Sequence, residues 1–524
     1  MASENRYSRW MAYATFGLCL FMFLYMTLTG WETPFISEKF GFRQTQTALS
    51  VSALLKGGPW LAYETPILGP PWSFPFEFPL YQWLVALIVK TGLLPLAPAG
   101  RLLGIMFFVA SLYPCYRILR LLEFSRNQSL AILCLLCSSA EYLFWTRTLM
   151  IESTALALAV TYLWLVLEYI KRELSVFKNA LYLNAFIAFA GGGAASVKVT
   201  TFLPFICAAF TAAAVLYYQK LSKSGLRTTI TALKSDFLFI MCAFVIPVQA
   251  FISWTNFCDS VKLQNPLTAG STSRAMSSWC FGTLDQKLSP ETWVKFYNVT
   301  FTDILGNNTL LLCAAVALVF CSWRVRLLAF TVFLFSVLHL VVFSNLNLVH
   351  GYYAYGHGIF ILAAVGMICA ELAVSGSFFK RAAGVILFVL VLTCSWFHYY
   401  RSYLPLQGST PEYFTQMKRD IDYFTNPDDV IIVFGWSYSS EPAYYLQRRA
   451  VMLQNDDFTR PNYLAIRRNL KDYKIGAVMI LRWSADDMKL VNNVVREFGL
   501  STSSFLQTYP EGAVFYRYGG QSGR

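Results

Sequence analysis

The chain has 524 residues, of which 56% are hydrophobic and only 14% are charged. Soluble domains carry about 25% charged residues, so this composition excludes an ordinary soluble protein and predicts a polytopic α-helical membrane protein. The net charge of +13 comes from Lys and Arg in short clusters between apolar segments. This pattern is typical of cytoplasmic loops and argues against nucleic acid as a partner.

Apolar segments recur through the first 400 residues, and each approaches the roughly 20 residues that a helix needs to cross a bilayer. The first is long enough to be a retained span and not a cleaved signal peptide. Placing the basic clusters on the cytoplasmic side predicts eleven crossings with the N-terminus cytoplasmic. These are residues 9–29, 102–122, 128–145, 150–170, 180–197, 200–218, 236–254, 309–323, 327–346, 357–376 and 382–398.

The apolar segment at residues 80–96 does not fit this pattern. Pro79, Lys90 and Pro95 make it a poor simple span. An even number of crossings must separate two cytoplasmic clusters, so we expect the segment to lie at the outer surface or to re-enter. The alternative is a crossing that breaks the positive-inside bias.

The predicted topology gives the outer side a long first loop, residues 30–100, and a second loop, residues 255–308. Cys258 and Cys280 share the second loop. In an extracytoplasmic loop they could form one disulfide or remain free.

The chain changes character after Tyr400, where charged residues return and apolar runs shorten to strand length. "DVIIVFGW" and "GAVMILRW" predict buried strands, and the end of the chain predicts a hairpin around Pro510, Glu511 and Gly512. We therefore expect a membrane domain over 1–404 and a small extracytoplasmic α/β domain over 405–524.

Two carboxylates near the outer side are candidates for catalysis. Glu77 lies in "FPFEFPLYQW", whose aromatic and proline residues would pack around it, and the alternative is an interfacial carboxylate facing water. Glu152 begins a predicted span in "WTRTLMIESTAL". Stabilisation by the helix dipole and pairing with Arg147 would explain both residues without any activity.

Lys198, in "GGGAASVKVTTFLP", lies between two predicted spans. It could bind a lipid phosphate or simply extend toward the interface. The outer turn "VHGYYAYGHG" carries His350 and His357, which could share a divalent metal ion with a carboxylate. The alternative is a belt of interfacial His and Tyr. No cofactor is otherwise indicated.

The sequence shows no Gly-rich phosphate loop, no DxD-like pair and no nucleotide-binding fingerprint. A reaction driven by a nucleotide sugar or by ATP on the cytoplasmic face therefore lacks support. An enzyme acting on the outer side would need a donor carried by the membrane.

"FEFPLYQWL", "RTLMIE", "SVKVTT" and "HGYY" follow one another in this order. In that order they resemble the GT-C class of multi-spanning glycosyltransferases, and most nearly the bacterial protein-mannosyltransferase-like enzymes, which include the lipid A aminoarabinose transferase. The resemblance covers roughly the first 360 residues. It implies a GT-C fold in a bacterial inner membrane.

The activity implied by the resemblance is inverting transfer of a sugar from a polyprenyl-phosphate carrier to a glycan, lipid or protein acceptor on the outer face. A carboxylate accepts the acceptor's proton, and cations stabilise the departing phosphate. By position, the carboxylates are Glu77 and Glu152, and the phosphate-binding residues are Arg43, Arg147 and Lys198.

The chain departs from the family pattern in the first outer loop. Arg43 and Gln44 stand where many relatives have an acidic pair, and Phe78 replaces a phosphate-binding Lys. The base is then sought first at Glu77, next at Glu152, and after these at Glu32 or Glu38.

The segment "FGFRQTQTALS", residues 40–50, is expected to begin an amphipathic helix at the outer surface. Arg43 would meet the carrier phosphate, Gln44 and Thr47 would hydrogen-bond the sugar, and Tyr353 would join them in binding sugar or acceptor. The alternative is an interfacial helix whose polar face meets only water.

Two other functions stay open on the sequence. The chain could transport or flip a lipid-linked glycan, which matching helix-breaking segments in two halves would favour. It could also be an inactive scaffold of the same fold.

Overall fold

The computed structural model describes residues 6–35, 41–172, 177–408, 414–435, 438–454, 461–481, 488–498 and 504–517. The chain forms two compact units. The helical unit comprises Met1–Trp31, Gly100–Trp254 and Ser277–Gly408, and the sheet unit comprises Glu32–Ala99, Thr255–Met276 and Ser409–Arg524. The sequence analysis counted 32–99 and 255–276 with the membrane domain. The domain boundary at residue 405 stays a prediction, because compactness does not test independent folding.

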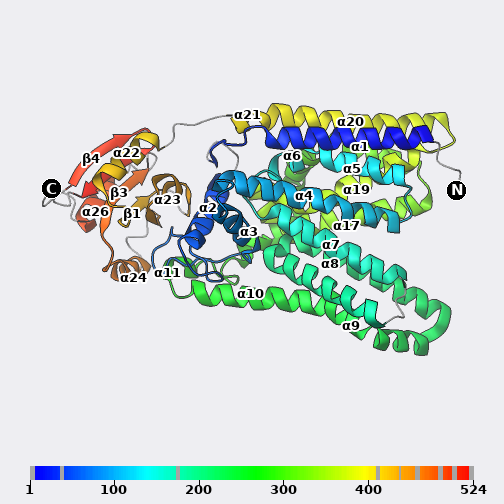
Figure 1. Cartoon of the computed structure of the whole chain (residues 1–524), viewed down its shortest axis with the longest axis horizontal. Coiled ribbons are helices and arrows are strands. Elements are labelled where there is room, and N and C mark those ends of the chain that lie inside the picture. The colour runs from blue at the N-terminus through cyan, green and yellow to red at the C-terminus, as the bar shows by residue number, and fades with distance from the viewer. Residues whose placement is uncertain are drawn as a thin grey trace. The chain divides into compact units, whose positions relative to one another are not determined.

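Long helices make up most of the helical unit, as Figure 1 shows. They are α1 (Arg6–Leu28), α4 (Leu96–Leu121), α5 (Arg126–Ser138), α7 (Glu152–Arg172), α8 (Phe177–Ser235), α10 (Ile246–Lys262), α16 (Thr309–Leu318), α17 (Trp323–Val342), α19 (Ala354–Ala373) and α20 (Phe378–Ser402). Shorter elements connect them: α6 (Ala140–Trp145), α9 (Phe237–Ile240), η2 (Met241–Val245), α12 (Ser277–Phe281), α13 (Leu284–Leu288), α14 (Pro290–Lys295), η3 (Phe296–Thr300), α15 (Phe301–Leu305), α18 (Ser344–Val349), η4 (Gly351–Tyr353) and α21 (Leu404–Gly408).

Among the described residues, eight helices are long and apolar enough to cross a membrane. The count is nine if Pro290–Leu305 and Thr309–Leu318, which meet at 81°, form one span. The chain is an integral membrane protein with multiple spans, as predicted. The prediction of eleven crossings exceeds this count partly because residues 128–145 do not form one helix: Ser139, with ψ of 132°, separates α5 from α6.

The other reason is that α8 contains two antiparallel limbs. The α8 limb from Phe177 starts just after the last residue of α7, yet Lys198 pairs with Glu152, the first residue of α7. Tyr217, further along, shares Asp236 with Tyr169 near the end of α7, through hydrogen bonds of 3.0 Å. The chain therefore reverses at Lys198, where φ is −161° and ψ is 92°.

We call these two limbs, residues 177–197 and 199–217, the α8 hairpin. They correspond to the predicted crossings 180–197 and 200–218, so counting them separately restores one of the missing spans. The helix α3 (Leu80–Lys90) has only 11 residues. It is about 16 Å long, too short for the roughly 30 Å hydrocarbon core, so it is not a simple span.

A five-stranded sheet forms the centre of the sheet unit. Its order is β2-β1-β3-β5-β4, with β2, β1 and β3 parallel and with β5 antiparallel to both β3 and β4. The predicted strands and terminal hairpin are confirmed, and β2 was missed. The strands are β1 (Val430–Phe434), β2 (Arg449–Leu453), β3 (Ile475–Leu481), β4 (Ser504–Tyr509) and β5 (Gly512–Arg517). The helices are α2 (Gly41–Leu55), α3, α11 (Pro266–Ala269), α22 (Thr415–Phe424), α23 (Glu441–Leu446), α24 (Pro461–Asn469) and α26 (Met488–Phe498).

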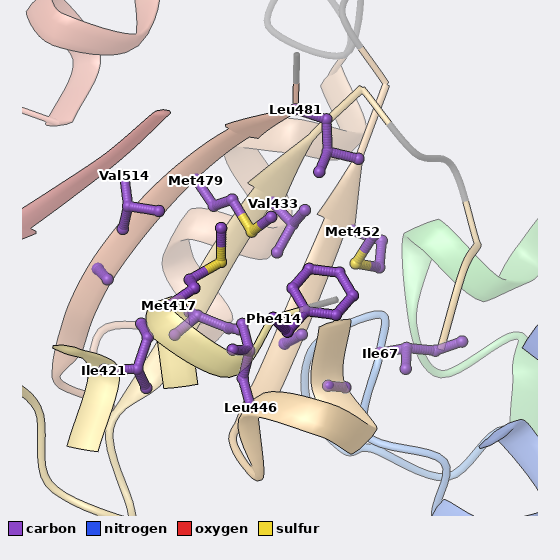
Figure 2. Close-up of a cluster of buried hydrophobic side chains, with 14 of the residues drawn as sticks. Ile67, Phe414, Met417, Ile421, Val433, Leu446, Met452, Met479, Leu481 and Val514 are labelled. Atoms are coloured by element: carbon purple, nitrogen blue, oxygen red, sulfur yellow. The ribbon is translucent and has the colours of Figure 1, made fainter. Parts of the chain in front are cut away.

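Part of the first loop joins this sheet at β2. The Ala450 amide donates to the Pro66 carbonyl, and the Met452 amide donates to the Ile67 carbonyl, both at 2.9 Å. Side chains of the loop also enter the sheet's core, shown in Figure 2, where Ile67 lies with Met452 and Leu446. The loop therefore covers the edge that β2 would otherwise leave unpaired.

Shortening Ile67 tests this arrangement. Ile67 is 1% exposed, and removing so buried a side chain typically costs about 2–5 kcal/mol. We expect Ile67→Ala to accelerate hydrogen exchange at the amides of β2, while Leu506→Ala, at a position 50% exposed in β4, changes it little. Equal protection in the two variants would contradict a structural role for the loop.

Candidate functional site

A buried ion pair marks one end of α7. The Lys198 ammonium contacts the Glu152 carboxylate, and the two side chains are 7% and 2% exposed. The ammonium also lies over the rings of Tyr352 and Tyr353, at 5.0 and 4.5 Å from their centroids. We call these four residues the Lys198 cluster. It places a desolvated cation between a carboxylate and two aromatic faces.

The local sequence explains why the chain can place a Lys here. Glu152 is the first residue of α7, where the helix dipole favours a carboxylate. Small residues let the helices approach closely: a Cβ on Gly356 would lie 2.7 Å from Thr201 Oγ1, and one on Gly191 would lie 2.8 Å from the Tyr162 ring. The reversal of the α8 hairpin then directs Lys198 toward the start of α7.

The Lys198 cluster has hydrogen-bonding capacity left over. Among the described residues, the Lys198 ammonium has one hydrogen-bond acceptor, Glu152 Oε1, for its three N–H groups. Glu152 Oε2 and the buried hydroxyls of Thr154 and Thr200 have no partner there. Because buried polar groups are nearly always satisfied, this end of α7 has the character of a ligand site.

Arg147 has a different environment from the one predicted. Its guanidinium is fully buried and donates to the carbonyls of Thr27, at 3.1 Å, and Gly30, at 2.5 Å. Arg101, also fully buried, donates to the Trp31 carbonyl at 2.5 Å. The two cations therefore bind the carbonyls at the end of α1 and just after it. This geometry favours a structural role for Arg147 over phosphate binding.

The two predicted metal ligands are held by different neighbours. His357 is buried in α19, where Nδ1 lies 2.7 Å from Ser336 Oγ and Nε2 lies 3.3 Å from Asn347 Oδ1. His350 stacks on Tyr352, with ring centroids 5.4 Å apart. The described residues contain no group of three His, Cys, Asp or Glu side chains able to hold a metal. Within the described part of the chain, the predicted ion therefore has no set of three such ligands.

A second ion pair lies in the sheet unit. Arg43, in the first turn of α2, donates from Nη2 to Glu77 Oε1 and from Nη1 to Gln46 Oε1, both at 2.6 Å. The Arg43 and Glu77 side chains are 20% and 23% exposed, so solvent or a ligand can reach them. We call these three residues the Arg43 cluster. The helix expected in this segment is α2, which begins at Gly41, and its Arg43 pairs with Glu77, the carboxylate ranked first as the base.

The loop around Glu77 is fixed by Tyr63. The Tyr63 hydroxyl donates to the Glu77 carbonyl at 3.2 Å and accepts from the Phe76 amide at 2.9 Å. Burial is the main cause that raises the pKa of this Tyr63 phenol, and the Glu77 charge adds to it. The phenol therefore stays neutral and acts as a bridge that positions Glu77.

Of the two sugar-binding residues predicted in α2, Gln44 does not reach the surface, whereas Thr47 is half-buried. Gln44 is fully buried, and the Thr47 hydroxyl donates to the Arg43 carbonyl one turn back, at 3.1 Å. Gln46, which the sequence analysis overlooked, is the amide that holds Arg43. Of the lower-ranked bases, Glu32 is exposed, and Glu38 lies outside the described residues.

No disulfide joins Cys258 or Cys280 to another described cysteine. Because Cys258 belongs to the sheet unit and Cys280 to the helical unit, the predicted alternative of a disulfide between them stays untested. Cys258 is 2% exposed and its thiol lies 3.5 Å from the Phe76 carbonyl oxygen, within the sheet unit. A buried thiol with this partner behaves as a small apolar residue.

A carboxylate missed by the sequence analysis lies at the start of α23. Glu441 is 5% exposed and accepts a hydrogen bond from the Ser439 hydroxyl at 3.1 Å. The neighbouring Ser440 hydroxyl binds the first turn of α2, through the Phe42 carbonyl and the Thr45 hydroxyl. Burial raises the pKa of Glu441 to about 7.

This pKa predicts a pH-dependent stability. The neutral acid is favoured in the folded state, so Glu441 costs nothing below its unfolded pKa of 4.5 and destabilises the fold as pH rises through about 7. The difference corresponds to roughly 3 kcal/mol at pH 8. We expect Glu441→Gln to raise the thermal unfolding midpoint at pH 8 and not at pH 4. Asp428→Asn, at an exposed position, should do neither; an equal gain at both values of pH would contradict the assignment.

Known structures resemble this arrangement of helices and sheet, although no protein-family model and no curated protein matches the sequence. ArnT from Cupriavidus metallidurans bound to undecaprenyl phosphate matches with a TM-score of 0.61 and 11% identity, over 96% of this chain and 98% of that one. AglB, an oligosaccharyltransferase from Archaeoglobus fulgidus in complex with an inhibitory peptide and a dolichol-phosphate, matches with a TM-score of 0.54 and 10% identity, over 99% and 75%.

Both are GT-C glycosyltransferases. The chain has the GT-C fold. The resemblance noted from four short sequence motifs is therefore confirmed for the fold, and it extends over nearly the whole chain.

Within this GT-C fold, the predicted residues fall into two groups. The structure brings Glu152 together with Lys198 and Tyr353, and it brings Glu77 together with Arg43. His350 stacks on Tyr352 beside the first group, and the Thr47 hydroxyl donates to the Arg43 carbonyl in the second. The remaining predicted residues have other surroundings: Gln44, Arg147 and His357. Tyr352 and Gln46 were assigned no site role from the sequence, although each lies next to a predicted residue, Tyr353 and Thr47.

Proposed function

We propose that the chain is a membrane glycosyltransferase that moves a sugar from a polyprenyl-phosphate carrier to an acceptor, with inversion at the anomeric carbon. The GT-C fold supports this proposal, because a solved relative in fold holds undecaprenyl phosphate and another holds a dolichol-phosphate. The observation that carries it in this chain is the Lys198 cluster, a buried cation with unused N–H groups in that fold.

In the helical unit, the Lys198 cluster would bind the donor phosphate. Two N–H groups of the ammonium are available to phosphate oxygens, and the phosphate gains negative charge as the sugar departs. Because the site is desolvated, this stabilisation exceeds what the same contact gives in water. Glu152 holds Lys198 in place, and the half-buried Tyr353, beside the ammonium, would contact the sugar.

For the base, the ranking from the sequence is kept: Glu77, which Arg43 contacts within the sheet unit, comes first, and Glu152, beside Lys198 in the helical unit, comes second. The step is written for Glu77. The acceptor's nucleophilic oxygen attacks the anomeric carbon while the bond from that carbon to the phosphate oxygen breaks. The bonding electrons leave with polyprenyl phosphate, and the acceptor's proton passes to the Glu77 carboxylate. The charges balance, because one carboxylate is neutralised as the phosphate gains one negative charge.

The same proposal assigns the topology predicted from the basic clusters. The N-terminus would be cytoplasmic, and the sheet unit would lie outside a bacterial inner membrane. The α/β domain would help to bind the acceptor or to shape its binding site. The acceptor would be a glycan, a lipid or a protein, and the transfer assay below distinguishes these.

Transfer of a radiolabelled sugar tests the proposal. The protein in lipid nanodiscs would be incubated with polyprenyl-phosphate-linked pentoses and hexoses and with candidate acceptors. We expect labelled acceptor and free polyprenyl phosphate in equal amounts. Movement of intact donor across liposomes without cleavage would instead indicate a transporter, and no turnover of any donor would indicate an inactive scaffold.

A further inference from the structure

A large apolar cavity lies in the helical unit and has no place in the proposed reaction. Its volume is about 680 Å³. Helices α4, α5, α7, α8, α17 and α19 all contribute to its lining, which reaches buried residues such as Leu133, Val160 and Phe205. Interiors normally contain few voids larger than a water molecule, so a space of this size needs an occupant.

The cavity opens to the surface between the second limb of the α8 hairpin and α17. Val215 and Leu327 line it and are 50% and 53% exposed. In a membrane-spanning unit such a surface faces lipid. An apolar cavity of about 150 Å³ already excludes water and binds benzene, so a hydrocarbon chain is the natural occupant of this one.

A positive charge marks one end of the cavity. Arg324, near the start of α17, lines it and is 57% exposed. Its Nη2 contacts Glu123 Oε2 at 3.0 Å and the Leu122 carbonyl at 2.6 Å, and Glu123 also contacts Lys171 at 3.3 Å. Two cations share one carboxylate, which leaves a net charge of +1. Exposed pairs of this kind are weak and can yield to a lipid phosphate.

We propose that this cavity binds one acyl chain of an anionic glycerophospholipid, with the phosphate beside Arg324. The site is distinct from the Lys198 cluster. Lys198 pairs with the first residue of α7, whereas the cavity contacts Val160, Leu163 and Leu167 toward the end of α7 and shares no residue with the cluster. Lys171 and Arg324 both contact Glu123 at this end of the bundle. In the topology proposed above this end faces the cytoplasmic leaflet, whose lipids are anionic.

Native mass spectrometry of the protein with defined lipids tests the site. Ala212 lines the cavity, whereas its neighbour Ala214 is exposed and does not. With phosphatidylglycerol we expect Ala212→Trp to bind one lipid fewer than wild type and Ala214→Trp to bind the same number. Equal binding by the two variants would overturn the proposal.

A second experiment tests the lipid head group. It tests the proposal even if the Ala212→Trp variant does not fold. Arg324→Gln should reduce the preference for phosphatidylglycerol over phosphatidylcholine about fivefold, as expected for one cation near a lipid surface. Arg326→Gln, which is exposed on the same helix and does not line the cavity, should leave the preference unchanged. An equal loss in both variants, or displacement of the bound lipid by one equivalent of polyprenyl phosphate, would overturn the proposal.

Discussion

Replacing Glu77 with Gln should lower the rate of sugar transfer by about 10²–10⁴-fold, the usual contribution of a general base. Gln keeps the shape of the side chain and an oxygen able to accept from Arg43, but it cannot take the acceptor's proton. The measurement is single-turnover transfer from a saturating donor, so that weaker donor binding does not contribute.

Glu64→Gln is the matched control for this change. Glu64 lies in the same loop, paired through its backbone with Ser73, and no role is assigned to its carboxylate. We expect its variant to transfer at the wild-type rate. Equal transfer rates for the two variants would show that Glu77 is not the base. Glu152 would then be the next candidate.

Replacing Lys198 with Met should have two effects that can be separated. Leaving Glu152 buried without its cation is expected to destabilise the fold by about 3–5 kcal/mol. Without the ammonium, the departing phosphate loses the N–H groups that would stabilise its charge. Transfer should therefore fall by about 10²–10³-fold, as when one hydrogen-bond donor to a developing negative charge is removed. Thermal unfolding measures the first effect and transfer from polyprenyl-phosphate sugar measures the second.

The double variant Lys198→Met with Glu152→Gln separates structure from function. It removes both charges, so we expect most of the stability to return while transfer stays low. Lys223→Met, an exposed position in α8, is the control and should match wild type in both measurements. Recovery of transfer in the double variant would show that Lys198 only balances Glu152.

The sequence predicted those parts of the fold that depend on local pattern. Apolar segments of membrane-spanning length, the strands β1 and β3, and the terminal hairpin are all encoded within short windows. The two limbs of the α8 hairpin were also predicted, because Lys198 interrupts an otherwise apolar run. The pairing of the Pro66–Ile67 backbone with β2 was not predicted. It joins residues nearly 400 positions apart, and no local sequence pattern indicates such a contact.

The candidate site shows the same limit. Glu77 and Arg43 were both named, but their contact joins residues 34 positions apart and follows from the fold alone. For Arg147, phosphate binding stays a prediction, and the alternative weighed beside it depended on a local pair. Glu152, five residues on, suggested that pair, whereas the guanidinium donates to carbonyls 120 and 117 positions earlier. Glu441 was not predicted either, because its burial at the start of α23 comes from tertiary packing and not from a local sequence pattern.

The most direct test of the central claim measures polyprenyl phosphate binding and single-turnover transfer in the same preparations. The account predicts that Glu77→Gln binds the carrier as wild type does but transfers little sugar. The double variant at Lys198 and Glu152 should fold and yet bind the carrier weakly. Wild-type transfer by Glu77→Gln together with wild-type carrier binding by the double variant would contradict the account.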